Sequence, residues 1–226
     1  SLVVSDSVNI LGTLAVAAQY LDVNGQLGGT GSLTVSSGEL YVSGNWNMTS
    51  FSSGTSIVTF DGSGNSEMQS ATTFHRLSLN KSLSTEQLFA SSVIALTIDS
   101  ALTVAVGTLT LNSASALTLS ASGSGTDFFN MTSSSAILDI GGTDAFPSGF
   151  ESVSLSSAST VQYSGASQTI THQETDGGTL TYGNLILSGS GIKLPSGAID
   201  VNGDFSSSNV TFSGGSSSIV LAVTGQ

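Results

Sequence analysis

Apolar and polar residues alternate along most of this chain in short runs, each closed by glycine, asparagine or serine. The runs Leu102–Val104, Leu109–Leu111 and Leu117–Leu119 begin seven and eight residues apart. Alternation with a period of two predicts β-strands, and no window keeps the i, i+3, i+4, i+7 spacing of an amphipathic helix. The sequence therefore predicts an all-β protein made of many short strands.

Longer segments of the chain recur. The matched pairs are Val42–Trp46 with Val201–Phe205, Ile57–Gly62 with Thr160–Gly165, and Phe74–Asn80 with Tyr182–Ser188. Units of this kind bury their apolar side only against their neighbours, which is typical of solenoids. Three short strands joined by small residues make a coil of about 20 to 25 residues. We therefore predict a parallel β-solenoid (β-helix).

Two dipeptides leave another fold open. Asn24-Gly25 and Asn202-Gly203 favour type I′ turns, and the alternative fold is accordingly a β-sandwich made of hairpins. The chain is interpreted as one repeat domain over residues 1–226, with an internal division near residue 125 as the alternative. The most linker-like segment, Ser120–Thr126, lies there.

Charge narrows the range of partners. Three cations, Arg76, Lys81 and Lys193, stand against 15 carboxylates, giving a net charge of −12. So few cations cannot neutralise a phosphate backbone or an anionic membrane surface, so we expect no nucleic-acid partner. Cysteine is absent, and no apolar run reaches the ~20 residues of a membrane helix, so we expect no membrane insertion. The first residues lack the pattern of a signal peptide, so either a signal has been removed or the chain is part of a longer one.

The repeats resemble a known kind of protein. Gly44–Asn47, Ser53–Gly64 and Thr73–Lys81, with their second copy in Ser159–Ile170 and Tyr182–Gly191, resemble repeats of large secreted prokaryotic surface proteins. These proteins are adhesin-like and predicted to be β-helical, and are similar in texture to autotransporter passengers and filamentous haemagglutinins. The resemblance covers about half the chain and implies an extracellular or cell-surface structural protein. The proteins of this kind are usually far longer than 226 residues. The shorter chain suggests a subunit that gains length by self-association.

Candidate catalytic residues are few. His172–Asp176 (HQETD) is the one dense cluster of titratable groups that includes a histidine, and in a strand His172, Glu174 and Asp176 would share one face. Gly177 and Gly178 follow directly, which favours a solvated loop. We therefore predict no catalytic residues and no enzyme activity.

A calcium site is a second possibility. Asp200, Asn202 and Asp204 place oxygen ligands at positions 1, 3 and 5, as a calcium loop does, but Phe205 stands where that loop needs glycine. Asp22 and Asn24 repeat the first two positions. An Asx-stabilised turn explains both segments without a metal, so the expectation is no cofactor, with calcium as the alternative.

Four sequons are candidate N-glycosylation sites, at Asn47, Asn80, Asn130 and Asn209. Asn47 and Asn209 each follow a Val-x-Gly turn, which predicts similar outer positions for the two.

Aromatic residues of the repeats are predicted to be core: Trp46, Phe60, Phe74, Tyr163 and Tyr182. A glycan-binding or adhesive module of a larger surface protein is the alternative function. It predicts an exposed aromatic cluster that would contact surface glycans, formed by Phe128, Phe129, Phe146 and Phe150.

The leading hypothesis is a non-enzymatic extracellular structural protein that self-assembles into a homopolymeric filament, sheath or surface layer. Solenoids end in unpaired backbone groups, which template another chain unless charge, proline or a cap blocks them. Both terminal segments are apolar and uncharged. The predicted assembly residues are Leu2, Val3, Val4, Ile219, Val220, Leu221 and Val223.

Overall fold

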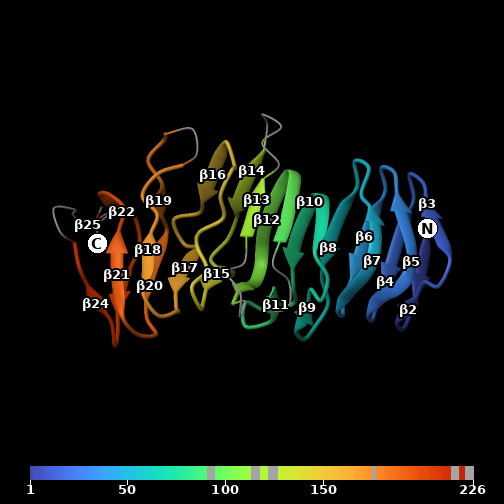
Figure 1. Ribbon diagram of the computed structural model, residues 1–226, viewed down its shortest axis with the longest axis horizontal. Coiled ribbons are helices and arrows are strands. Elements are labelled where there is room, and N and C mark those ends of the chain that lie inside the picture. The colour runs from blue at the N-terminus through green and yellow to red at the C-terminus, as the bar shows by residue number, and fades with distance from the viewer. Residues whose placement is uncertain (91–94, 113–117, 122–126, 175–176, 215–218, 222–226) are drawn as a thin grey trace.

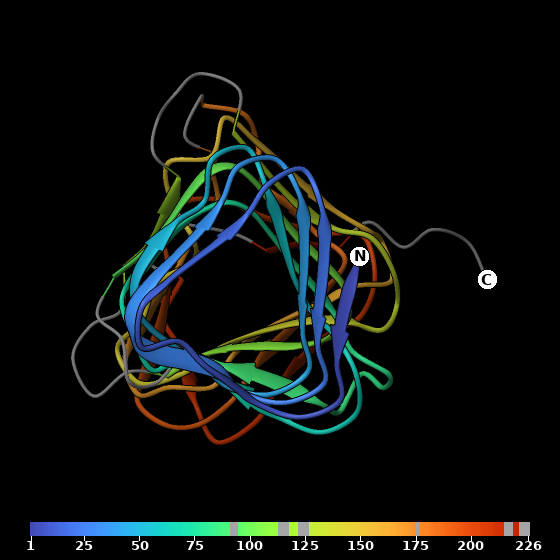
Figure 2. The same cartoon turned by 90° about the vertical axis from the view of Figure 1, so that its right-hand side faces the viewer.

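The computed structural model describes residues 1–226 except 91–94, 113–117, 122–126, 175–176, 215–218 and 222–226. Within the described ranges the chain forms strands and turns and no helix. The strands stack in parallel into a β-solenoid of about nine turns, an elongated rod with β1 and β25 at opposite ends (Figure 1). Viewed along the rod, the coils have a triangular outline (Figure 2). The predicted parallel β-solenoid is confirmed.

Each coil passes along three faces, which we number in chain order. The strands of face 1 are β1 (Leu2–Val4), β4 (Tyr20–Val23), β6 (Glu39–Val42), β8 (Ile57–Phe60), β14 (Phe128–Met131), β16 (Ser152–Leu155), β19 (Thr181–Tyr182), β22 (Ile199–Val201) and β25 (Ile219–Leu221). Face 2 carries β2 (Val8–Asn9), β9 (Ser66–Glu67), β11 (Gln87–Phe89), β15 (Ala136–Ile140), β17 (Thr160–Tyr163), β20 (Asn184–Leu187) and β23 (Phe205–Ser207). Face 3 carries β3 (Thr13–Val16), β13 (Thr118–Ala121), β18 (Gln168–Ile170), β21 (Ile192–Pro195) and β24 (Thr211–Phe212). Four long strands bend around corners: β5 (Leu27–Val35) and β7 (Trp46–Ser52) span faces 2 and 3, β10 (Thr72–Asn80) spans faces 3 and 1, and β12 (Ala95–Leu111) spans all three.

Equivalent residues of successive coils lie on top of one another. On face 1, Leu21 pairs with Leu40, and Leu40 pairs with Val58. All three point inward and are buried. Because side chains alternate along a strand, the residues between them point outward. The period of two in the sequence is therefore the inside and outside of a solenoid whose interior is filled with side chains.

The aromatic core predicted from the repeats is confirmed, since Trp46, Phe60, Phe74, Tyr163 and Tyr182 are all fully buried. The Trp46 and Phe74 ring centroids lie 5.3 Å apart. In the C-terminal half, the hydroxyls of Tyr163 and Tyr182 lie 3.0 Å apart. Burial raises the pKa of both phenols, so they remain neutral donors and acceptors inside the core.

The hairpins of the alternative β-sandwich are not formed. Asn24-Gly25 and Asn202-Gly203 both lie at the corner between faces 1 and 2, where Asn24 and Asn202 donate their N–H groups to carbonyls of the preceding coil at 2.9 Å. Neither glycine has a positive φ. A Cβ at Gly203 would stand 2.3 Å from Asn184 Oδ1, and one at Gly25 would stand 2.7 Å from the nearest backbone nitrogen. Glycine is therefore required by close coil stacking and not by a type I′ turn.

The internal repeats do not all occupy the same face. Val42–Trp46 and Val201–Phe205 both run from face 1 to face 2, as a shared register requires. Ile57–Gly62, however, starts on face 1, whereas Thr160–Gly165 starts on face 2. On each of the three faces a strand is followed by a corner, so the same short sequence motif can form the strand and corner of any face.

Coil length changes along the rod. Leu21 and Leu40 are separated by one coil of 19 residues, whereas Leu109 and Leu138 are separated by one of 29. Coils of intermediate length also occur, as between Leu77 and Leu102, which are 25 residues apart, so the predicted coil of about 20 to 25 residues lies within the observed range. Strand pairing continues across residue 125, because β14 pairs with β12 on one edge and with β16 on the other.

Candidate assembly edges and surface grooves

Both ends of the rod present a strand of face 1. β1 pairs with β4 and β25 pairs with β22, and within the described part of the chain neither strand has a second partner. Among the described residues, each therefore has one backbone edge without a partner strand. The predicted assembly residues Leu2–Val4 and Ile219–Leu221 form these two strands, and Val223 lies outside the described residues.

The two end strands expose large apolar side chains. Leu2 is 56% exposed, Val3 58% and Val220 49%. Beside β1 the first coil contains an apolar hollow of about 360 Å³, lined by residues of β1, β3 and β4 and the turn between the last two, including Leu14, Val16 and Leu21. Inward-facing residues of the first coil thus remain open toward the end of the rod.

Two of the three cations, Lys81 and Lys193, point into the body of the rod. The Lys193 Nζ is buried and donates to the Gly165 and Ala166 carbonyls, each at 2.8 Å, and to Gln168 Oε1 at 2.6 Å. Burial lowers the pKa of the Lys193 ammonium, while these three acceptors favour the charged form. This lysine joins the corner between faces 2 and 3 of one coil to the next coil.

Lys81 does the same at the corner between faces 1 and 2. Its Nζ donates to the Asp61 carbonyl at 2.6 Å, to Ser66 Oγ at 2.7 Å and to the Ser43 carbonyl at 3.2 Å. Arg76 donates its Nη2 to the Thr55 carbonyl at 3.1 Å. All three cations are thus used to satisfy backbone carbonyls of the preceding coils, a role that sequence reasoning missed because nothing local marks it.

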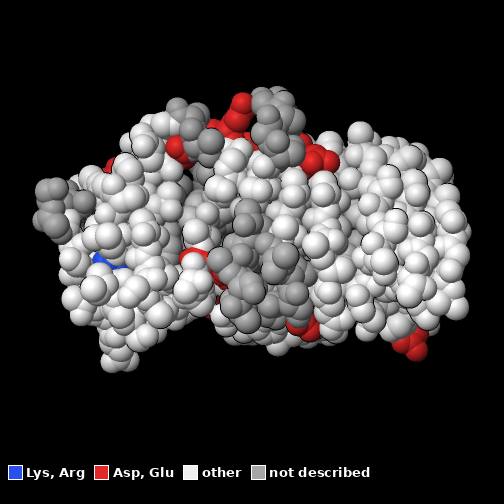
Figure 3. Space-filling model, viewed as in Figure 1, with Lys and Arg blue, Asp and Glu red and all other residues white. Residues whose placement is uncertain are grey.

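Because the cations are bound to backbone carbonyls, most of the charged groups on the surface of the rod are carboxylates. Figure 3 shows acidic residues gathered over the middle of the rod and one small cationic area toward the C-terminal end. Burial raises the pKa of Asp61, against the effect of the Ser43 hydroxyl that donates to it. Burial likewise raises the pKa of Asp139, with Ser164 as its donor.

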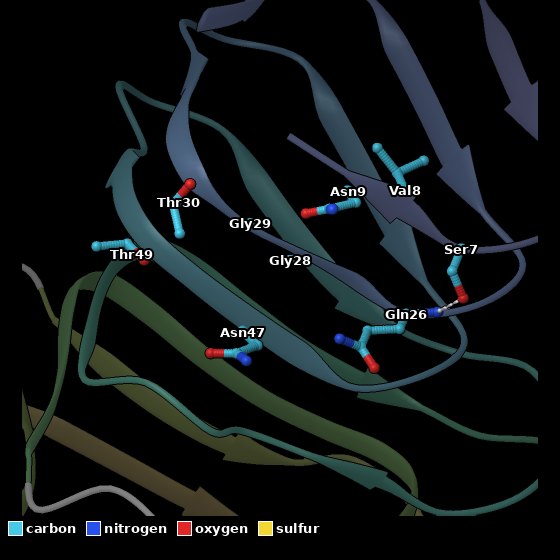
Figure 4. A pocket seen from close by; sticks show the side chains of 9 residues that line it. All are labelled: Ser7, Val8, Asn9, Gln26, Gly28, Gly29, Thr30, Asn47 and Thr49. Atoms are coloured by element: carbon cyan, nitrogen blue, oxygen red, sulfur yellow. Dashed lines mark hydrogen bonds between the residues drawn. The ribbon is translucent and has the colours of Figure 1, made fainter. Parts of the chain in front are cut away.

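A neutral polar hollow of about 460 Å³ lies on face 2 near the N-terminal end (Figure 4). Gly28 and Gly29 form its floor, and side chains from three successive coils border it, among them Asn9, Thr30 and Asn47. Gly29 has a φ of 138° and a Cβ there would stand 2.1 Å from the Ile10 carbonyl oxygen, so no other residue fits. The hollow exists because close coil contact requires these glycines.

The sequons occupy different settings. Asn47 is exposed on the flat outer side of face 2, and its sequon partner Thr49 borders the same hollow. Asn209 is exposed in the turn after β23 with a φ of 59°, so the similar positions expected for Asn47 and Asn209 are not observed. Asn80 is exposed and Asn130 half-buried. Glycosylation of all four remains a prediction.

The proposed calcium ligands lie around one corner. Asp200 is half-buried on β22, and Asn202 and Asp204 are exposed in the turn that follows. The Asp204 N–H donates to Asn184 Oδ1 at 2.8 Å, so an Asx side chain of the previous coil holds this turn. In the described ranges no group of three or more His, Cys, Asp or Glu side chains could hold a metal ion. Calcium binding here remains a prediction.

The described part of the histidine cluster, residues 172–174, lies at a turn and not in a regular strand. The Glu174 N–H donates to the Gly178 carbonyl, and Gln173 and Thr179 form an antiparallel bridge. His172 Nδ1 lies 2.7 Å from Ser196 Oγ, and Asp176 lies outside the described residues. These contacts hold His172 and Glu174 at a turn, so the shared strand face expected for the cluster is not observed for these two residues.

The predicted exposed phenylalanine cluster is wrong as a surface feature. Phe129, Phe146 and Phe150 are buried and pack together, with ring centroids 5.9 Å and 5.8 Å from that of Phe129. Phe128 alone is exposed, at 37%. Adjacent residues of a strand point to opposite sides, so Phe128 and Phe129 could not share a surface.

No family model, no curated protein and no solved structure matches this chain. No helix long and apolar enough to cross a membrane occurs among the described residues.

Proposed function

We propose that this protein is a non-enzymatic extracellular structural subunit whose rods join end to end into a filament, sheath or surface layer. The observation that carries the proposal is that the open strands at both ends, β1 and β25, belong to the same face and run parallel. A second copy stacked on the first continues face 1 without a change of direction. Such a head-to-tail contact does not close, so it generates an open polymer.

The side-chain alternation fixes the register of this joint. Val220 pairs with Asp200, and Val3 pairs with Asp22, and all four residues lie at outward positions. Placing Val220 of one copy opposite Val3 of the next keeps inward positions inward. A shift by one residue would turn the apolar inner row toward water.

Charge is compatible with this register. Asp200 and Asp22 would be separated by three strand spacings, about 14 Å at ~4.8 Å per spacing. This exceeds the Debye length of ~8 Å at physiological salt, so their repulsion is largely screened. Cohesion comes from backbone pairing of β25 with β1 and from apolar burial, worth about 25 cal/mol per Å².

The register can be tested by disulfide trapping, because the chain has no cysteine of its own. Paired strands place Cα atoms within the range that a disulfide spans. The double variant Val3→Cys/Val220→Cys should give a ladder of covalent multimers on a non-reducing gel after mild oxidation. Val220→Cys alone should give at most a covalent dimer, because one cysteine per chain can link only two chains. Val3→Cys/Ile192→Cys should give no ladder, because Ile192 lies on β21, which already has a partner strand on both edges. Absence of a ladder in the first variant overturns the proposed joint.

Charge placed at the joint supplies a second test. Val220 and Ile192 are both 49% exposed, so Val220→Lys and Ile192→Lys add the same charge at matched surface positions. We expect Val220→Lys to abolish concentration-dependent growth in light scattering, and Ile192→Lys to leave it unchanged. A native chain that stays monomeric at micromolar concentration would contradict the proposed function itself.

A further inference from the structure

Two rows of outward side chains run along face 1, parallel to the axis of the rod. The strand registers place Thr59, Ser78, Thr103 and Asn130 in one row on successive coils, following Tyr41. A second row runs beside the first on the same coils, with one residue from each coil. It consists of Glu39, Ile57, Arg76, Ala101 and Phe128. One row therefore offers hydroxyl and amide groups, and the other is mainly apolar or aromatic.

Residues of both rows line a surface groove of about 290 Å³ on face 1. Its lining includes Tyr41 toward one end, Phe128 toward the other and the small residues Thr59, Ala101 and Thr103 between them. Five coils at a spacing of ~4.8 Å give the groove a length of about 19 Å. It exists because small side chains lie between two aromatic ones.

The groove continues beyond Phe128. A second hollow, of about 480 Å³, is lined by Asp127, Phe128, Asn130, Glu151 and Ser152. Phe128 belongs to both hollows, so its ring divides one continuous surface. An elongated ligand lying along the axis would contact both hollows and cross this ring.

The chemistry of the lining selects the class of ligand. Aromatic and aliphatic surfaces pack against the apolar faces of sugar rings, while hydroxyl and amide groups exchange hydrogen bonds with sugar hydroxyls. Carboxylates stand near both ends, Glu39 in the first hollow and Glu151 in the second. Arg76, the one cation in the lining, is bound through Nη2 to the Thr55 carbonyl. This charge pattern disfavours polyanions.

We propose that the face 1 groove binds a neutral polysaccharide strand lying parallel to the solenoid axis, with Tyr41 and Phe128 as its two stacking residues. This site goes beyond assembly through the rod ends, because it lies on the side of the rod and involves neither β1 nor β25. In a polymer the rows would repeat along the surface, so that one glycan strand contacts several subunits and gains avidity.

Affinity electrophoresis tests the proposal with the whole chain. The acidic protein is run in native gels containing hydroxyethylcellulose, galactomannan or laminarin as neutral probes and polygalacturonate as the anionic probe. We expect at least one neutral probe to retard the protein. Tyr41→Ala and Phe128→Ala should each raise the apparent dissociation constant about tenfold, as loss of a central aromatic contact does. Tyr41→Phe, which keeps the ring, should retain binding, and Ile192→Ala on face 3 is the matched control.

Several outcomes would overturn this site. No retardation by any neutral probe, stronger retardation by polygalacturonate, or an equal loss in Ile192→Ala would each do so. The molar mass of the glycan-free protein is measured in parallel by light scattering. If Tyr41→Ala and Phe128→Ala lower that mass, the groove is a contact between copies of this chain and not a glycan site. None of these results depends on the joint between β25 and β1.

Discussion

Replacing Lys193 by methionine isolates the role of a buried corner lysine. Methionine is unbranched and apolar, so it keeps most of the packing of the lysine stem and removes only the ammonium group. The substitution removes the donor that approaches the Gly165 and Ala166 carbonyls at 2.8 Å each, and the Gly165 carbonyl keeps the Ser190 N–H at 3.2 Å. Gln168 Oε1 loses one donor and keeps the Gly165 N–H at 2.9 Å.

The expected magnitude follows from these three bonds. A hydrogen bond to a charged group contributes about 1.5–3 kcal/mol, and a buried group left unsatisfied costs about 1–3 kcal/mol. The sum overstates the loss, because the variant no longer has to desolvate an ammonium. We expect a net loss of about 3 kcal/mol in the free energy of unfolding. For a chain of this size that lowers the melting temperature by roughly 6–12 °C.

The matched control is Arg76→Met. It removes the same positive charge, but Arg76 is only half-buried and makes one hydrogen bond, to the Thr55 carbonyl at 3.1 Å. Its loss should change stability by about 0–1 kcal/mol. Thermal unfolding by circular dichroism compares the two variants, and hydrogen exchange locates the effect. Because each coil of a solenoid contacts only its neighbours, faster exchange should be confined to the coils around β18 and β21.

Equal melting temperatures of Lys193→Met and Arg76→Met would refute this reasoning. The stabilisation would then come from net charge alone, and the three acceptors of Lys193 would contribute nothing. Faster exchange in the N-terminal coils of Lys193→Met would also contradict it, since no contact of Lys193 reaches them.

Three further predictions follow from the same features. Gly29→Ala should lose at least about 2 kcal/mol of stability, because its φ of 138° suits no other residue, whereas Gly12→Ala, whose Cβ would meet nothing within 4 Å, should be nearly neutral in chemical denaturation. The raised pKa of Asp139 means that the folded state holds more protons than the unfolded chain between the ordinary and the raised value, so stability should rise as pH falls through that window. Asp139→Asn should therefore melt higher at neutral pH and show a smaller pH dependence in differential scanning fluorimetry, and an unchanged pH profile would contradict this. End-to-end association should strengthen as ionic strength rises or as pH falls toward the isoelectric point near 4.1, which sedimentation velocity can measure, and polymers that dissolve in moderate salt would place the joint elsewhere.

The sequence alone predicted the class of the fold and most of its core. Short runs of alternating apolar and polar residues require strands with one buried side. The few residues between successive runs are enough for one corner of a coil and too few for a helix. The aromatic residues of the repeats were placed correctly because each sits at an inward position of its run, as Trp46 and Tyr163 do. The apolar character of the two end strands was likewise readable, since it depends on local composition.

What the sequence could not supply is the arrangement of residues far apart in the chain. Lys193 and Gly165 are 28 residues apart, and only coil stacking brings that ammonium to that carbonyl. The groove between Tyr41 and Phe128 likewise requires four successive registers, with coils of different length between them.

The physical reason is that a solenoid repeats one local rule on three equivalent faces. Alternation decides which side chains point inward, because that property belongs to a single strand. The length of every preceding corner and coil decides which face a strand occupies and which residues lie above and below it. Ile57–Gly62 and Thr160–Gly165 illustrate the division, since similar sequences form similar strands on different faces. The sequence determined the strands and their inner sides, and the stacking of the coils determined the corners, the grooves and the joint.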